Sequence, residues 1–209
     1  MLFRSQPEEE AQSLALKSES YTKGSQDIFA YETNVDLNNQ VVIFNLKKLS
    51  GKLKPFALMV IQDYIWQHVV DHKDEFVTRV YFDEMQNQFE TDDQAAFFTN
   101  MYARIRKYGS IPTGITQNVE TLLSRKEGRN LLYNSEFIVL LKQKKTTIPY
   151  LLKTINLTDA LIRYIEKPKA IGTGLIIAGS TTVPFENPIP EDTELFRLVA
   201  TDAYRNLED

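Results

Sequence analysis

Two adjacent carboxylates, Asp83 and Glu84, end a short run of β-branched and aromatic residues, Val77–Phe82. Such a run predicts a buried strand. A carboxylate at the end of a strand can hold Mg²⁺ through a water molecule, and a second carboxylate beside it can polarise an attacking water. Many strands also end in an acid that is merely solvated, so the assignment depends on the residues that follow.

Two further side chains lie at a spacing that suits hydrolysis of a nucleoside triphosphate. Arg106 ends the helix predicted after the acid pair, and Gln117 ends the next predicted strand. In a parallel sheet the ligand crevice lies beyond the carboxyl ends of the strands, so we expect Asp83, Glu84 and Gln117 to face one pocket. A glutamine there can orient the water or sense the γ-phosphate, and an arginine on an outer helix can reach a neighbouring subunit's site.

Simpler interpretations exist for these residues. Arg104 and Arg106 fall in the last turns of their helix, where cations complement the helix C-terminus. Gln117 and Asn118 precede another helix, and asparagine is a favoured N-cap residue. We assign the capping role to Asn118 and the functional role to Gln117.

Composition limits the class of protein. The 209 residues are 43% hydrophobic and 25% charged, which is ordinary for a soluble globular chain. The lack of cysteine excludes a disulfide framework and a thiolate metal site, and favours a cytoplasmic location. A net charge of −4 argues against a dedicated nucleic-acid surface, though not against a local patch. Polar residues interrupt the most apolar stretch, Phe56–Val70, so we expect no transmembrane segment.

Strands alternate with helices, which indicates an α/β fold with a mainly parallel sheet flanked by helices. The predicted strands are Val41–Leu46, Val77–Phe82, Ile111–Asn118 and a buried Phe137–Leu141, followed by an antiparallel hairpin over Gly174–Val183 that turns at Gly179-Ser180. The predicted helices are Pro7–Ser20, Pro55–His72, one between a capping box at Thr91 and Gly109, Ser124–Leu132 with a second capping box, Pro149–Ile155, Thr158–Glu166 and about Glu191–Tyr204.

Two of these helices carry a further expectation. The helix from Pro55 is apolar nearly all round, so we expect it to pack inside an assembly. The helix before Gly109 places Phe98, Met101, Ile105 and Tyr108 on one stripe. We expect the whole chain to form one domain, with residues 1–25 as an N-terminal helical segment and 26–209 as the α/β core.

Five stretches resemble the C-terminal part of the traffic ATPases of conjugation and type IV secretion. They are TNVDLNNQVVIFNL, VYFDEMQNQF, ARIRKYGSIPTGITQNVETLL, NSEFIVLLKQ and GLIIAGSTTVPFENPIPEDTELFRL. The likeness runs from about Glu9 to Thr201 and is most specific where RKYG is followed by TGITQN. This VirB/TraC/CagE-type family belongs to the HerA–FtsK branch of RecA-like motors.

The resemblance implies a RecA-like P-loop NTPase core, ATP and Mg²⁺ as ligands, and self-association into a hexamer or dimer. It implies docking to channel and coupling proteins at the cytoplasmic mouth of a secretion channel, including a peripheral position at the inner face of the membrane, to energise transfer of DNA or protein. By position, Asp83 matches the Walker B aspartate that binds Mg²⁺ through water, and Glu84 matches the catalytic glutamate. Gln117 matches the sensor glutamine, and Arg106, with Arg104 as the second choice, matches the arginine finger.

The phosphate-binding loop of such motors does not occur in this sequence. A P-loop needs G-x-x-x-x-G-K-[ST], and this motif does not occur; Gly51-Lys52 and Gly24-Ser25 lack its spacing. In the family the loop lies upstream of everything seen here, so we expect a C-terminal piece: an expressed fragment, a truncated gene product or half of a split one. We expect this piece neither to bind ATP tightly nor to hydrolyse it.

Two other functions fit the same residues. One is a catalytically silent module that binds partner ATPases or channel proteins. The other is a DNA-pumping motor of the same superfamily that works outside secretion.

Overall fold

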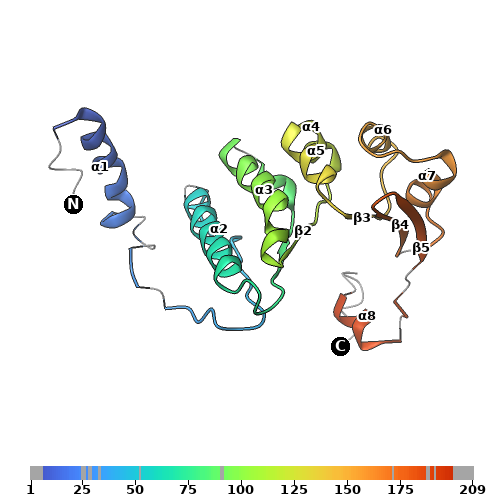
Figure 1. Cartoon of the computed structure of the whole chain (residues 1–209), viewed down its shortest axis with the longest axis horizontal. Coiled ribbons are helices and arrows are strands. Elements are labelled where there is room, and N and C mark those ends of the chain that lie inside the picture. Colours follow the sequence, from blue (N-terminus) through green and yellow to red (C-terminus); the bar gives the residue numbers. More distant parts are fainter. Residues whose placement is uncertain are drawn as a thin grey trace. The chain divides into compact units, whose positions relative to one another are not determined.

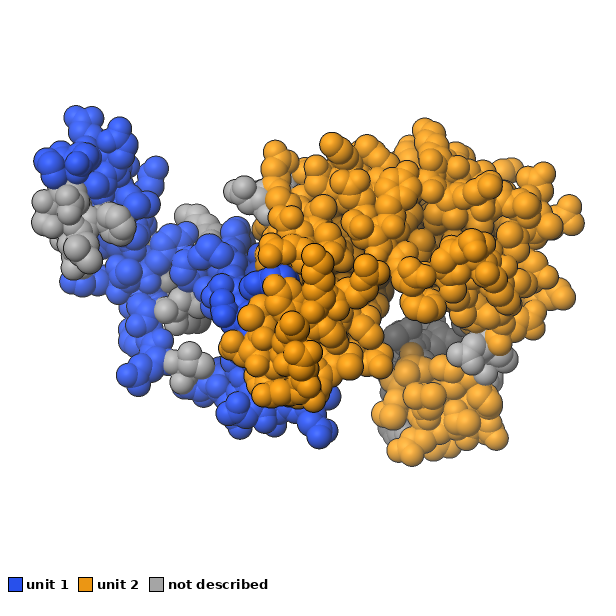
Figure 2. Space-filling view, in the orientation of Figure 1, with its two compact units in different colours: residues 1–68 blue, residues 69–209 orange. Residues whose placement is uncertain are grey.

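The computed structural model describes residues 7–24, 27, 30–32, 34–51, 53–89, 92–170, 172–186, 189–190 and 192–199. Residues 1–68 and 69–209 form two compact units, which Figure 2 colours separately. The division falls inside helix α2 (Lys54–Asp71).

The first unit contains helix α1 (Glu9–Thr22), a connecting segment and most of α2. Both helices were predicted from the sequence. Glu9 and Glu10 lie in the first turn of α1, where the helix dipole favours negative charge. Aromatic contacts help to pack this unit. Rings of Tyr21 and Phe56 stack with centroids 5.1 Å apart, and Phe44 meets Tyr64 edge-on at 5.7 Å.

The strand predicted over Val41–Leu46 is wrong. This segment forms no strand, and Val41 and Ile43 are 75% and 83% exposed. Apolar β-branched residues favour a strand only where a neighbouring strand supplies hydrogen bonds and packing, and none of the described strands pairs with this segment. Helix α2 likewise leaves Met59 and Val60 exposed, so the single chain does not enclose that helix on every side.

The second unit begins with a parallel pair of short strands. β1 (Arg79–Phe82) lies beside β2 (Ile111–Gly114), with Arg79 opposite Ile111 and Phe82 opposite Gly114. The chain between these strands forms helix α3 (Asp92–Arg104), labelled in Figure 1. Two short 3₁₀ helices flank it, η3 (Met85–Gln88) before it and η4 (Ile105–Tyr108) after it. The strand predicted to reach Asn118 is therefore shorter, since regular pairing stops at Gly114.

The apolar stripe predicted for α3 is confirmed as the core beside β1. Phe98, Met101 and Ile105 are each 1% exposed, while Tyr108 is half-buried. Phe82 of β1 packs edge-on against Phe98 with ring centroids 4.9 Å apart. The predicted capping residue Thr91 lies outside the described residues.

Two helices follow β2 where one was predicted. Asn118 caps α4 (Val119–Ser124), and α5 (Lys126–Tyr133) begins after the extended Arg125. The second capping box is therefore wrong: Ser124 ends α4, and its hydroxyl donates to the Thr121 carbonyl at 2.7 Å. Asn118 supplies an earlier cap, because its side chain accepts the Thr121 N–H at 3.0 Å.

A three-stranded antiparallel sheet forms the rest of the second unit. β4 (Thr173–Ala178) pairs on one side with β3 (Phe137–Leu140) and on the other with β5 (Thr181–Glu186). The predicted hairpin is confirmed, and Gly179 adopts φ 57° in its two-residue turn, a backbone conformation that glycine reaches without strain. Helices α6 (Ile148–Leu152) and α7 (Asp159–Glu166) supply apolar side chains to the core of this sheet, which contains Leu140, Leu151, Ile165 and Leu175.

The expectation of a mainly parallel sheet is wrong for the described residues. Only β1 and β2 pair in parallel, and β3 joins the hairpin antiparallel. Alternation of strands and helices does not fix strand direction here, because two short helices and their loops return the chain against β3. β3 is also not buried on both faces, since Phe137 and Val139 are 71% and 57% exposed. The last described helix, α8 (Glu194–Val199), lies within the predicted range, whose start at Glu191 and end beyond Val199 are outside the described residues.

Candidate functional site

The loops that follow β1 and β2 lie side by side. Backbone pairing continues past the last regular residue of each strand, because the N–H of Ile115 donates to the Phe82 carbonyl and the N–H of Met85 donates to the Ile115 carbonyl, both at 2.8 Å. The residues after Ile115 are thereby brought beside the acid pair that follows Phe82. This edge is the carboxyl end of a parallel pair, where ligands of α/β proteins bind.

Glu84 and Gln117 meet at this edge, as the sequence predicted. Nε2 of Gln117 donates to Oε1 of Glu84 at 2.6 Å. Glu84 is half-buried, whereas Gln117 is exposed. A carboxylate and an amide can thus act on the same small ligand from neighbouring strands.

Two side chains without an assigned role from the sequence complete the arrangement. Nε2 of Gln86 donates to Oε2 of Glu84, and the Thr116 hydroxyl donates to Oε1 of Gln86. Thr116 Oγ1 in turn accepts the N–H of Asn118 at 3.2 Å. We call Glu84, Gln86, Thr116 and Asn118 the hydrogen-bonded relay. Its only sequence signal is position: Gln86 lies two residues after Glu84, and Thr116 lies directly before Gln117.

The backbone at Glu84 adopts an unusual conformation. Its φ and ψ are both 48°, in the left-handed region that residues other than glycine rarely enter. The N–H of Asn87 donates to the Glu84 carbonyl at 2.9 Å, which closes the first turn of η3. Backbone conformations of this kind persist where the surroundings hold them, and they concentrate at functional sites.

Asp83 lies at the same edge but outside the relay. It is exposed, and its Oδ1 accepts the N–H of Glu84 at 3.0 Å. A carboxylate oxygen is the hard ligand that Mg²⁺ or its bound water prefers. Asp83 therefore offers an exposed carboxylate oxygen at this edge that could hold a metal-bound water.

Met85, Tyr102 and Gly114 pack together next to this edge. Met85 is buried, and the half-buried Tyr102 directs its hydroxyl to Met85 Sδ at 3.8 Å. Burial raises the pKa of the Tyr102 hydroxyl above its ordinary value. A Cβ at Gly114 would lie 2.2 Å from Met85 Sδ, so a side chain at this position requires the buried Met85 side chain to shift.

Arg106 does not join this cluster. Arg106 is exposed in η4, which ends at Tyr108 with Gly109 as its C-cap, before β2 begins at Ile111. It therefore lies near the amino end of β2, whereas Glu84 and Gln117 follow the carboxyl ends, separated by about 10 Å of strand. In the described part of the chain, no hydrogen bond or ion pair joins the Arg106 side chain to Asp83, Glu84 or Gln117.

This fold is found in a solved structure. The chain matches VirB4 of Thermoanaerobacter pseudethanolicus with a TM-score of 0.71 and 21% sequence identity, over 87% of this chain and 51% of that chain. The fold is that of VirB4. The resemblance to type IV secretion ATPases inferred from the sequence strings is thereby confirmed at the level of the fold.

The likeness to VirB4 has defined limits. No family model matches the sequence, and no curated protein matches it. The chain spans about half the length of the VirB4 structure. In the part of the chain that the structure describes, no helix combines the length and apolarity needed to cross a membrane.

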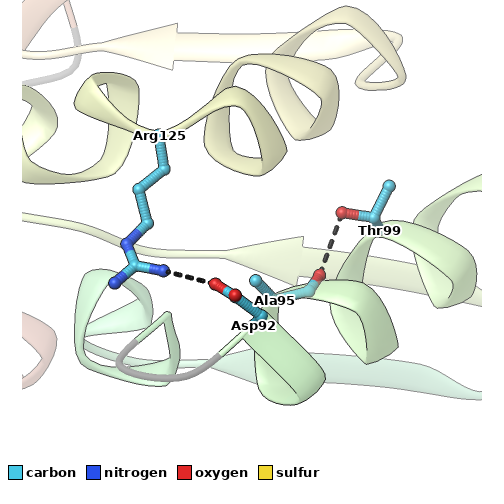
Figure 3. Close-up of polar contacts among 4 residues, drawn as sticks. All are labelled: Asp92, Ala95, Thr99 and Arg125. Carbon is cyan, nitrogen blue, oxygen red and sulfur yellow. Dashed lines mark hydrogen bonds and ion pairs between the residues drawn. The ribbon is translucent and has the colours of Figure 1, made fainter.

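An ion pair joins the start of α3 to the segment between α4 and α5. Arg125, between α4 and α5, reaches Asp92 at the start of α3 with a nitrogen–oxygen distance of 3.5 Å (Figure 3). Asp92 is fully exposed, so solvent screens the pair and it adds little stability. The Thr99 hydroxyl in the same figure donates within α3 to the Ala95 carbonyl at 2.9 Å.

Proposed function

We propose that this chain is the C-terminal part of a RecA-like ATPase motor for conjugative transfer or type IV secretion. The observation that carries the proposal is the hydrogen bond between Glu84 and Gln117 at the carboxyl end of the parallel pair. An acid and an amide that follow neighbouring strands at this edge can polarise and orient a water for nucleoside triphosphate hydrolysis. The VirB4 fold supports the same conclusion independently.

The proposed roles follow from the chemistry of each side chain. Glu84 polarises the attacking water, because its carboxylate can accept a hydrogen bond from that water. Gln117 senses the γ-phosphate or orients the water, since its amide can donate and accept. Asp83 holds Mg²⁺ through a bound water. When bound, Mg²⁺ neutralises charge on the phosphates.

The residues present fit one side of the nucleotide site only. The sequence has no G-x-x-x-x-G-K-[ST] loop to cradle the phosphates. We therefore propose that the chain alone does not hydrolyse ATP, and that the cradle comes from a further segment or subunit. Arg106, at the other end of β2, acts in this proposal on a neighbouring subunit of a ring, with Arg104 as the alternative finger.

The proposed setting is the cytoplasmic mouth of a secretion channel. The motor would dock to channel and coupling proteins there and energise transfer of DNA or protein. The missing phosphate loop also favours a second candidate, a catalytically silent module that binds partner ATPases through the same surfaces. A DNA-pumping motor outside secretion is the third.

Turnover measurements separate a motor from the catalytically silent module. The 209-residue chain is compared with a longer polypeptide that supplies a phosphate-binding loop upstream, and Glu84→Gln is made in both. We expect MgATP hydrolysis only in the longer polypeptide, lowered by Glu84→Gln about 10²-fold or more. Hydrolysis by the short chain that Glu84→Gln abolishes would refute its inactivity. No hydrolysis by the longer polypeptide would favour the silent module.

A further inference from the structure

We infer that Gln86 and Thr116 are positioning residues that hold one oxygen of the Glu84 carboxylate while the other is exchanged between Gln117 and ligand. Calling them positioning residues rests on the proposed function of Glu84. The hydrogen-bonded relay on which the inference is built does not.

The direction of every hydrogen bond in the relay is determined from its two ends. A backbone N–H can only donate, so Thr116 Oγ1 must accept from Asn118. An ionised carboxylate can only accept, so Gln86 must present Nε2 to Glu84. The Thr116 proton is then available to Oε1 of Gln86, the one polarity that satisfies all three bonds. The Gln86 amide consequently has a single orientation.

The two oxygens of Glu84 have different surroundings. Oε2 is bound by Gln86, which is half-buried like Thr116 and Glu84. Oε1 is bound by Gln117, which is exposed. Hydrogen bonds are more persistent where water competes less for the same groups. The Gln86 side is therefore the fixed side, and the Gln117 side is the one from which a partner can leave.

The backbone explains why Gln86 can reach Glu84. Glu84 has left-handed φ and ψ, and η3 begins directly after it, so residue 86 lies within the same tight turn. The Met85 N–H bond to Ile115 anchors this turn to the loop that carries Thr116. Gln86 thus connects both loops of the site through one side chain.

This arrangement has a consequence for the proposed chemistry. When Gln117 turns from Glu84 to a γ-phosphate, Oε1 becomes available to a water. The bond from Gln86 to Oε2 prevents the carboxylate from rotating away at that moment. Without Gln86 and Thr116, release of Gln117 would also release Glu84.

Solution NMR of the 209-residue chain tests the relay directly. The signals are the side-chain amide protons of Gln86 and the carboxyl ¹³C of Glu84. In Thr116→Val, which removes the hydroxyl at similar size, we expect the Gln86 amide protons to exchange with solvent about tenfold faster, as loss of one hydrogen bond allows. Thr116→Ser should restore the original rate. Thr113→Val, a like substitution in β2 outside the relay, should leave it unchanged.

Gln117→Ala tests the independence of the two sides. We expect it to shift the Glu84 ¹³C signal while the Gln86 amide protons keep their protection. The inference is overturned if Gln117→Ala exposes the Gln86 amide equally, if Thr116→Val has no effect on it, or if Thr113→Val matches Thr116→Val. Because these measurements need no nucleotide, their failure is distinct from failure of the ATPase proposal, which turnover of the Glu84→Gln variant decides.

Discussion

Gln117 Nε2 lies 2.6 Å from Oε1 of Glu84, although the two residues are 33 positions apart in the chain. The parallel pairing of β1 with β2 brings them together, and the bonds between Ile115 and the residues around Glu84 extend that pairing into the loops.

Substitution of Gly114 tests the packing of Met85 and Tyr102 next to this contact. In Gly114→Ala the new methyl group would lie 2.2 Å from Met85 Sδ and 2.9 Å from the Tyr102 hydroxyl. We expect the free energy of unfolding to fall by about 1–3 kcal/mol, the usual result of overpacking, as measured by urea denaturation. Gly51→Ala is the matched control, because nothing lies within 4 Å of a Cβ at that position. Equal effects of the two substitutions would contradict the packing described for Gly114.

Asn118 tests the start of α4. Its side chain accepts the N–H of Thr121, so Asn118→Ala leaves that donor without its cap. We expect Asn118→Ala to lower the free energy of unfolding by about 1 kcal/mol. Asn118→Asp and Asn118→Ser, which can still cap the helix, should keep most of the parent's stability. If alanine and serine are equivalent in urea denaturation, the cap does not stabilise the helix.

Tyr102 predicts how stability depends on alkaline pH. Burial raises the pKa of its hydroxyl above the ordinary 10.0. As the pH rises, the Tyr102 hydroxyl therefore ionises in the unfolded chain before it does so in the folded chain. Its contribution to the free energy of unfolding is present below pH 10.0 and is lost as the pH rises above that value. Unfolding measured between neutral and strongly alkaline pH should show this decline, and Tyr102→Phe should reduce it. Tyr133→Phe, an exposed site, is the control, and an unchanged pH dependence in Tyr102→Phe would contradict the prediction.

Arg106 tests whether subunits complete one another's sites. It lies near the amino end of β2, away from Glu84 of the same chain, so we expect Arg106→Ala to leave unfolding unchanged within about 0.5 kcal/mol. In the longer polypeptide with a phosphate-binding loop, we expect turnover to fall about 10³-fold. Mixing Arg106→Ala with Glu84→Gln subunits should recover part of the activity, because some interfaces then combine two intact residues. Arg104→Ala is the comparison, and recovery from its mixture instead would assign the finger to Arg104.

Several elements could be predicted because short-range chemistry determines them. Asn118 caps α4 through a bond to a residue three positions away, and the turn at Gly179 needs only a glycine between two apolar runs. The stripe of Phe98, Met101 and Ile105 follows from helical spacing alone. These features depend little on the rest of the fold.

Other elements depend on partners that the local sequence does not specify. Val41–Leu46 has strand composition but no described strand beside it, and β3 runs antiparallel because α6 and α7 return the chain in that direction. The proximity of Glu84 and Gln117 could be predicted because the carboxyl ends of parallel strands lie at the same edge of a sheet. The roles of Gln86 and Thr116 could not be predicted, because they depend on the left-handed backbone conformation of Glu84, which the sequence does not indicate.

A double-mutant cycle on ATP turnover tests the central claim most directly. In the longer polypeptide with a phosphate-binding loop, Glu84→Gln, Gln117→Ala and the double variant are compared with the parent. If both side chains act on one water and phosphate, their effects are strongly non-additive, and the double variant is hardly slower than Glu84→Gln alone. Two losses that simply multiply would contradict a shared site at the end of β1 and β2.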